Sequence, residues 1–253
     1  MRPARCVPLN PGAKFHWQFS GDTGKLYAIT FGRGPSVKRK DRYQQMPSQL
    51  QRKPVNTYHH GDLREAMVRA ALAEAERGGP EAISIKALAK KLGVSQPAPY
   101  RHFADREALL VAVTAEAFRQ FTAVLREAVR KPSKRSKLSR IARATLDFGL
   151  TRNGLYRLMF VSRTKAGAPA GSELHQAARE TFALLLETLG SPVPGYVRER
   201  HALTIWTAVH GVVMLTEQGI LTGEAAHLSI EELVEGIVQQ TELAYAVAVR
   251  AGV

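Results

Sequence analysis

Apolar residues recur at helical spacing along most of the chain. The most regular stretch is 84–92, where four apolar residues follow one another at i, i+3, i+4 and i+7 from Ile85 and form one stripe. Ser84 is a favourable N-terminal cap for a helix that starts there. Gly93 stands where helices often end with a left-handed residue. The pattern therefore predicts a short helix over 84–92.

A second short helix is expected directly after the first. Ser95 or Gln96 would open it, with Pro97 just inside, where a missing backbone N–H costs little. Two short helices joined by a glycine-containing turn are typical of the helix-turn-helix, here spanning 84–103, whose second helix meets base edges in the major groove. We expect Phe103 to anchor this helix in the core.

The flanking pattern completes a small domain. Asp62 makes a capping-box-like start to an earlier helix, and the glycines and proline of 78–80 end it. Asp105 is expected to cap a longer helix that runs to about Arg130. Residues 61–121 are therefore predicted to form a three-helix DNA-binding domain.

The remainder, 122–253, is predicted to be a second helical domain, so the fold class is all-α. The last two helices are long and apolar on a broad face. Such a pair either finishes the core of a monomer or forms a four-helix interface with a second copy. We favour a homodimer, because a helix-turn-helix normally reads two half-sites. The expected helices are 138–150, 153–163, 172–189, 196–221 and 229–250.

Residues 1–55 lack this periodicity and are predicted to be a basic, disordered extension. They hold 11 Lys and Arg against 2 Asp and Glu, which is most of the chain's net charge of +14. Two short apolar stretches, at 15–19 and 25–31, could pair as a small hairpin. Met46 starts a segment that reads like a natural N-terminus, so 1–45 need not belong to the native protein.

The chain shows no motif of enzymatic chemistry. Metalloprotease, nucleotide-binding and nucleophile-elbow motifs are missing, so we expect no enzyme, no cofactor and no metal. An all-α enzyme acting on a small apolar ligand is a weaker alternative that lacks a pair of catalytic groups. No stretch reaches the ~18 apolar residues of a membrane span, and Cys6 is the only cysteine. We expect a cytoplasmic protein without membrane contact.

Residues 93–110, GVSQPAPYRHFADREALL, closely resemble the signature of the tetracycline-repressor (TetR/AcrR) family of bacterial regulators. YHHGDLR at 58–64 and WTAVHG at 206–211 are similar to a subgroup with a Trp…His-Gly signature in its C-terminal domain. The resemblance implies an all-α homodimer with an N-terminal DNA-binding domain and a C-terminal ligand-binding and dimerisation domain. It also implies repression that a small molecule relieves.

The resemblance further implies which residues contact DNA. Gln96 could pair with adenine, and Tyr100 and His102 match the family's phosphate-contacting positions. Arg106 stands where the family usually has lysine, and Pro99 departs from the family by stiffening the start of the helix. Packing or plain surface exposure is the alternative for each residue. The predicted DNA-binding residues are Ser84, Ser95, Gln96, Pro97, Ala98, Tyr100, Arg101, His102 and Arg106.

A ligand cavity could lie between helices of the C-terminal domain. The candidate lining residues are Tyr156, Met159, His175, Trp206 and His210, and ordinary core packing is the alternative for them. The favoured interpretation is a homodimeric repressor that a small-molecule effector releases from a palindromic double-stranded DNA operator. The alternative is a nonspecific architectural DNA-binding protein that draws its affinity from the basic extension.

Overall fold

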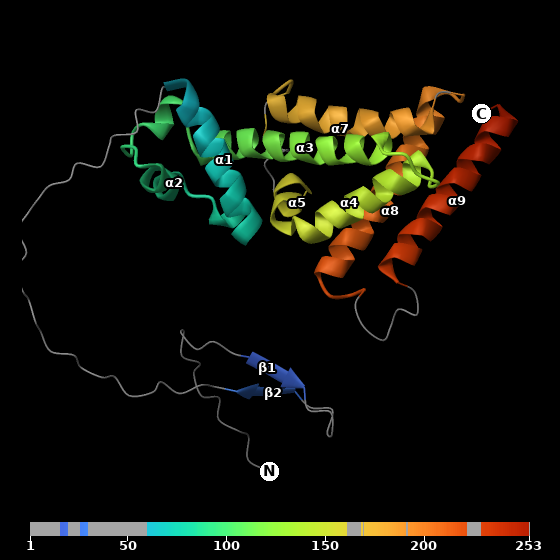
Figure 1. Cartoon of the computed structure of the whole chain (residues 1–253), viewed down its shortest axis with the longest axis horizontal. Coiled ribbons are helices and arrows are strands. Elements are labelled where there is room, and N and C mark those ends of the chain that lie inside the picture. The colour runs from blue at the N-terminus through green and yellow to red at the C-terminus, as the bar shows by residue number, and fades with distance from the viewer. Residues whose placement is uncertain are drawn as a thin grey trace, which may run out of the picture. The chain divides into compact units, whose positions relative to one another are not determined.

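The computed structural model describes residues 16–19, 26–29, 60–160, 168, 170–190, 192–221 and 229–252. The chain divides into two units, Met1–Val55 and Asn56–Val253. Within the described residues the second unit contains helices and connecting turns but no strand, which confirms the all-α prediction (Figure 1).

In the first unit, strands β1 (His16–Phe19) and β2 (Leu26–Ile29) pair antiparallel. His16 lies opposite Ile29 and Phe19 opposite Leu26, as expected for a hairpin between the two apolar stretches. The rest of the basic segment, which the sequence predicts to be disordered, lies outside the described residues.

The second unit begins with α1 (His60–Gly78) and the 3-10 turn η1 (Pro80–Ala82). The helix starts two residues before the predicted start, so Asp62 lies inside its first turn rather than ahead of it. The next helix, α2 (Ile85–Leu92), has the predicted caps. The Ser84 hydroxyl accepts a hydrogen bond of 3.4 Å from the Ala87 amide, and Gly93 is left-handed with φ 69°.

The second helix of the motif is not the α-helix that the sequence predicts. Residues 96–98 form a turn, followed by a single 3-10 turn, η2 (Pro99–Arg101). The backbone bonds run from i+3 to i: the Tyr100 amide donates to the Pro97 carbonyl at 3.2 Å, and the Arg101 amide to the Ala98 carbonyl at 3.3 Å. The physical reason is Pro99, which has no N–H to give the Ser95 carbonyl an i+4 bond, so that carbonyl accepts an i+3 bond of 3.1 Å from the Ala98 amide instead.

Helix α3 (Arg106–Arg130) crosses from the N-terminal half of this unit, which holds α1 and α2, into its C-terminal half. As predicted, the Asp105 carboxylate caps it and accepts a hydrogen bond of 2.8 Å from the Ala108 amide. By length and hydropathy alone α3 could cross a membrane, but 61% of its apolar window is buried inside this protein, as in the core helix of a globular domain. Helix α3 therefore contributes to the core of both halves, since it packs against α1 as well as against α4, α5 and α7.

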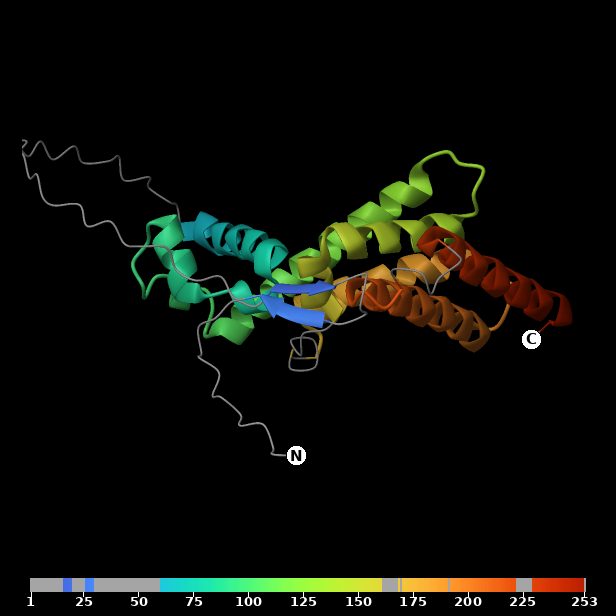
Figure 2. The same ribbon diagram turned by 90° about the horizontal axis from the view of Figure 1, so that it is seen from below.

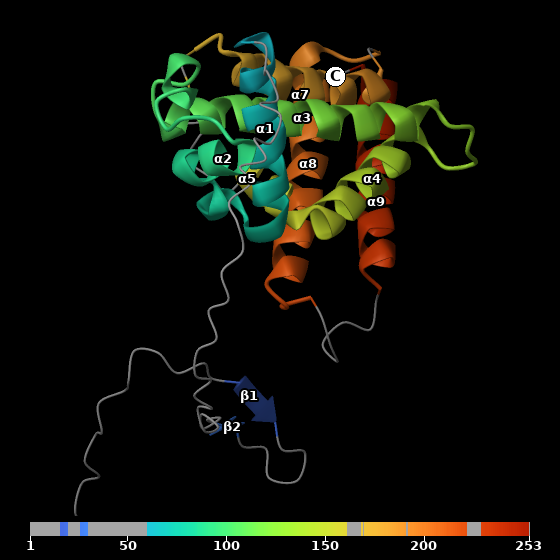
Figure 3. The ribbon, with the colours of Figure 1, turned by 60° about the vertical axis from the view of Figure 1, so that its left-hand side comes forward.

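The C-terminal half contains α4 (Lys137–Thr151), α5 (Asn153–Phe160), α7 (Glu173–Leu189), α8 (Gly195–Glu217) and α9 (Ile230–Ala251). All five correspond to predicted helices. Helix α8 ends earlier than expected, and residues 161–163 of the helix predicted over 153–163 lie outside the described residues. Helix α7 packs along α3, and α8 and α9 lie side by side at the far end from α1 (Figures 1–3).

The two halves meet most closely where α5 begins. Gly154 is buried, and a Cβ placed on it would overlap the Ala75 carbonyl of α1. The backbones of α1 and α5 therefore touch directly, which only glycine allows. Arg152, just before α5, adds a hydrogen bond of 2.6 Å from its Nε to the Glu76 carboxylate.

Replacing Gly154 by alanine should force α1 and α5 apart. Overpacking of this kind costs roughly 1–3 kcal/mol, so urea denaturation should show a free energy of unfolding lowered by that amount. Gly236→Ala in α9 is the matched control, since its Cβ would meet nothing within 4 Å and should stabilise the helix by about 0.5–1 kcal/mol. Equal effects of the two substitutions would refute the close contact.

Candidate nucleic-acid interface and ligand pocket

Residues 95–101 form the reading turn. One side of this turn packs against the core, and the other side is exposed to solvent. Phe103 is 3% exposed and Pro99 is buried, so both fix the turn to the core, as predicted for Phe103. Tyr100 is 55% exposed, and Gln96 and Arg101 are exposed as well. The turn therefore presents polar and cationic side chains to any partner that lies across it.

The other predicted contact residues are also accessible. Ser95 and Pro97 are exposed, while Ala98 and His102 are half-buried. The Ser84 hydroxyl is already used to cap α2. Its helix N-terminus still adds a partial positive charge to this face.

Two lysines of α2 extend the same surface and were missed by sequence reasoning. Lys86 and Lys90 are exposed and one helical turn apart, and with Ser84, Ser95 and Gln96 they line a shallow depression. Their spacing on the polar face of a predicted helix was the available signal. Such cations beside an exposed turn suit phosphate groups that flank a base-reading element.

Arg106 has a structural task that the sequence did not reveal. Its Nε donates to the Ile83 carbonyl at 3.0 Å, and its Nη2 donates to the Pro80 carbonyl at 2.7 Å. These bonds tie the start of α3 to η1. The predicted phosphate contact would therefore fall to the remaining nitrogen, Nη1, which lies 3.5 Å from Glu107.

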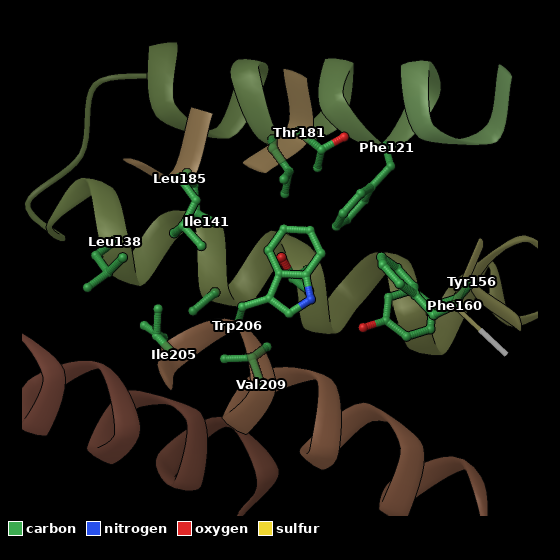
Figure 4. A pocket seen from close by; sticks show the side chains of 13 residues that line it. Phe121, Leu138, Ile141, Tyr156, Phe160, Thr181, Leu185, Ile205, Trp206 and Val209 are labelled. Atoms are coloured by element: carbon green, nitrogen blue, oxygen red, sulfur yellow. The ribbon is translucent and has the colours of Figure 1, made fainter. Parts of the chain in front are cut away.

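A small apolar pocket lies inside the C-terminal half, among α3, α4, α5, α7 and α8 (Figure 4). Its volume is about 30 Å³, roughly the room for one water molecule. Drug-sized ligands occupy about 300–1,000 Å³, so a ligand would have to move side chains to enter. The lining residues are Phe121, Leu125, Leu138, Ile141, Ala142, Thr145, Tyr156, Phe160, Thr181, Leu185, Ile205, Trp206 and Val209.

Of the five residues predicted for a ligand cavity, Tyr156 and Trp206 line this pocket. His210 lies beside it, because its Nδ1 and the Tyr156 hydroxyl share a hydrogen bond of 2.9 Å. Met159 is buried and His175 half-buried, and neither lines the pocket.

Burial keeps the polar pair beside the pocket uncharged. It lowers the pKa of His210 below its ordinary value of 6.5 and raises the pKa of the Tyr156 hydroxyl. The imidazole also lies against the aromatic rings, 5.5 Å from Tyr156 and 5.2 Å from Phe160 between ring centroids. The pair is thus a neutral hydrogen bond within an aromatic cluster.

The fold and these two sites define a helix-turn-helix protein with a helical bundle attached. Two family models match the chain: "Bacterial regulatory proteins, tetR family" over residues 67–113, and "Tetracyclin repressor-like, C-terminal domain" over residues 138–240. The chain belongs to the tetracycline-repressor family of transcriptional regulators.

Three individual proteins show what this chain is similar to. The class C tetracycline repressor protein of Escherichia coli is 48% identical over 54 residues, a match that spans 21% of this chain and 24% of that repressor. A protein of unknown function from Rhodococcus sp. RHA1 is 27% identical with a TM-score of 0.62, over 75% of this chain and 98% of that one. The transcriptional regulator FadR of Bacillus subtilis, solved in complex with stearoyl-CoA, shares the fold with 13% identity and a TM-score of 0.53, over 70% of this chain and 96% of that one.

The lowered pKa of His210 makes stability depend on pH. Below pH 6.5 and above the folded pKa, the unfolded chain binds more protons than the folded one, so the free energy of unfolding rises with pH in this window. Urea denaturation between pH 5 and 8 should show the wild type losing stability on acidification more steeply than His210→Gln. Parallel curves for the two proteins would rule out His210 as the titrating group.

Proposed function

We propose that this chain is a sequence-specific repressor that acts in the cytoplasm as a homodimer and leaves its palindromic operator when a small molecule binds the C-terminal pocket. The observation that supports DNA binding most directly is the reading turn. It is anchored by Phe103 and exposes Gln96, Tyr100 and Arg101, and Gln96 shares a depression with the cationic Lys86 and Lys90. These side chains are of the types that read bases and bind phosphates.

Dimerisation is proposed through α8 and α9. Leu203 of α8 is 52% exposed, and Leu243 and Val247 of α9 are 69% and 56% exposed. Leu243 and Val247 stand one turn apart on one side of α9, which itself packs against α8. Large exposed aliphatic side chains on a paired helix favour burial against a second copy.

Helix α5 is the proposed route from pocket to DNA. Tyr156 and Phe160 line the pocket, while Gly154 of the same helix touches the backbone of α1. Arg157 lies 3.7 Å from Glu81 of η1 and 3.9 Å from Glu217 of α8. A ligand that displaces the aromatic side of α5 would therefore shift α1 and with it the reading turn. The ligand acts only through its different affinity for the two arrangements.

The primary test is selection of bound fragments from random duplex DNA, followed by footprinting of the recovered sequence. Recovery of a palindrome is expected, with one reading turn on each half-site. If no sequence is preferred, the proposed repressor is refuted, and a loss of affinity for random duplex on trimming residues 1–45 would then favour the architectural alternative.

Substituting a base-reading side chain should change the base preference, whereas substituting a phosphate-binding side chain should change the overall affinity and its salt dependence. Gln96→Ala should relax preference at one base position by roughly 1–3 kcal/mol and keep the salt dependence. Lys90→Gln should weaken all sequences alike and reduce the slope of log K against log salt by about 1. Fluorescence anisotropy on the selected operator and its single-base variants would measure both effects, and identical changes in the two variants would contradict these roles.

The proposed dimer interface can be tested by introducing a charged side chain into it. Leu243→Glu should raise the dimer dissociation constant by at least about a hundredfold, because a carboxylate would be buried at the interface without a partner. Analytical ultracentrifugation should then find monomers that bind the full palindrome weakly. Leu150→Glu on α4, where the wild-type leucine is 38% exposed, is the control and should remain dimeric. A dimeric Leu243→Glu would place the interface elsewhere.

A further inference from the structure

The pocket lining restricts the charge of whatever binds there. Thirteen residues line it, and none of them is Asp, Glu, Lys, Arg or His. The neighbouring His210 is already bonded to the Tyr156 hydroxyl. An ionised group would lose its hydration without finding a counter-charge, which is costly in an apolar site. The occupant must therefore be uncharged.

The pocket has two chemically different ends (Figure 4). Leu138, Ile141 and Leu185 form its aliphatic end. The aromatic end is made by three rings, with centroids 4.7 Å apart for Tyr156 and Phe160 and 6.3 Å apart for Phe121 and Phe160. Rings in such tilted and edge-to-face arrangements offer an aromatic guest the contacts that it prefers. An alkyl chain suits the opposite end.

Two polar groups of the pocket lining have no hydrogen-bond partner within the described part of the chain, the Thr145 hydroxyl and the Trp206 indole N–H. The indole nitrogen of Trp206 lies on the side of the ring toward the aromatic end (Figure 4). The Thr181 hydroxyl, by contrast, donates to the Ala177 carbonyl at 3.0 Å and contacts the Thr122 hydroxyl at 2.7 Å. The pocket thus offers an N–H donor to an oxygen acceptor.

Trp206 also occupies the space that a ligand would need. Its indole lies between the two ends of the pocket (Figure 4), and it is only half-buried. Edge contacts with Phe160 and Phe182, each 5.8 Å between centroids, hold it in place. Moving one partly exposed side chain would join the two ends into one larger cavity.

We propose that the pocket takes an uncharged aromatic compound that carries an alkyl substituent and one acceptor oxygen, with the shifted Trp206 indole donating its N–H to that oxygen. The inference rests on the proposed function, because it names the chemical class of the effector. The aromatic part of the ligand lies against Tyr156 and Phe160, and the alkyl part lies among the aliphatic residues.

The test uses three probes of similar shape on the full chain. 4-Butylacetophenone is neutral with a carbonyl acceptor, 4-butylbenzoate is ionised at pH 7.5, and butylbenzene has no acceptor. Isothermal titration calorimetry should show the ketone binding about tenfold more tightly than butylbenzene, the value of one hydrogen bond, and at least a hundredfold more tightly than the carboxylate. A Trp17→Phe background leaves Trp206 as the single tryptophan, whose fluorescence should change with the ketone.

Two variants separate the roles of the indole. Trp206→Phe keeps an aromatic ring but removes the N–H, so the ketone should lose its tenfold advantage over butylbenzene. Val124→Ala on α3, where the wild-type valine is 39% exposed and outside the pocket, should keep that advantage. If circular dichroism shows that Trp206→Phe does not fold, the ranking of the three probes and the Trp206 fluorescence of the Trp17→Phe protein still test the proposed ligand class.

The inference is overturned if the carboxylate binds as tightly as the ketone, or if the ketone and butylbenzene bind equally. Operator binding by the same preparation keeps the two proposals apart. A protein that binds its palindrome but none of the probes overturns only the ligand class. A protein that binds the ketone with the expected ranking but selects no DNA sequence supports the ligand class and refutes the repressor.

Discussion

The contact between the backbones of α1 and α5 at Gly154 is the constraint on which the two halves of this protein depend. It makes one eight-residue helix a neighbour of both the DNA-binding domain and the pocket. The ion pairs around it, from Arg152 and Arg157, lie partly in solvent and contribute little by themselves. In the proposed function, coupling between the halves would therefore depend on close packing rather than on these ion pairs, because closely packed side chains transmit a displacement.

The pocket is almost closed because its own aromatic residues fill it. Phe121, Tyr156, Phe160 and Trp206 pack into one cluster in which little space is left. If the bundle takes the proposed effector, it has two competing arrangements, one filled by its own side chains and one filled by the ligand. Their difference in free energy sets how much effector is needed to populate the second.

The sequence predicted most of the helices, and the caps of α2 and α3, because those signals are local. Ser84, Gly93 and Asp105 each act within one turn of their own position. The prediction of an α-helix after Gly93 was wrong, because Pro99 outweighed the expected pattern. The bonds of Arg106 and most of the pocket lining join residues distant along the chain. No spacing rule within a helix reports which neighbouring helix a side chain will meet.

The prolines of the reading turn carry a wider consequence. Because the φ angles of Pro97 and Pro99 are fixed by their rings, this segment loses little conformational entropy when it binds in a DNA groove. Such rigidity lowers the entropic penalty of association but leaves little scope for adjusting to a related half-site. Over evolutionary time, a change of target would then have to come from exchanging the exposed side chains rather than from bending the backbone that carries them.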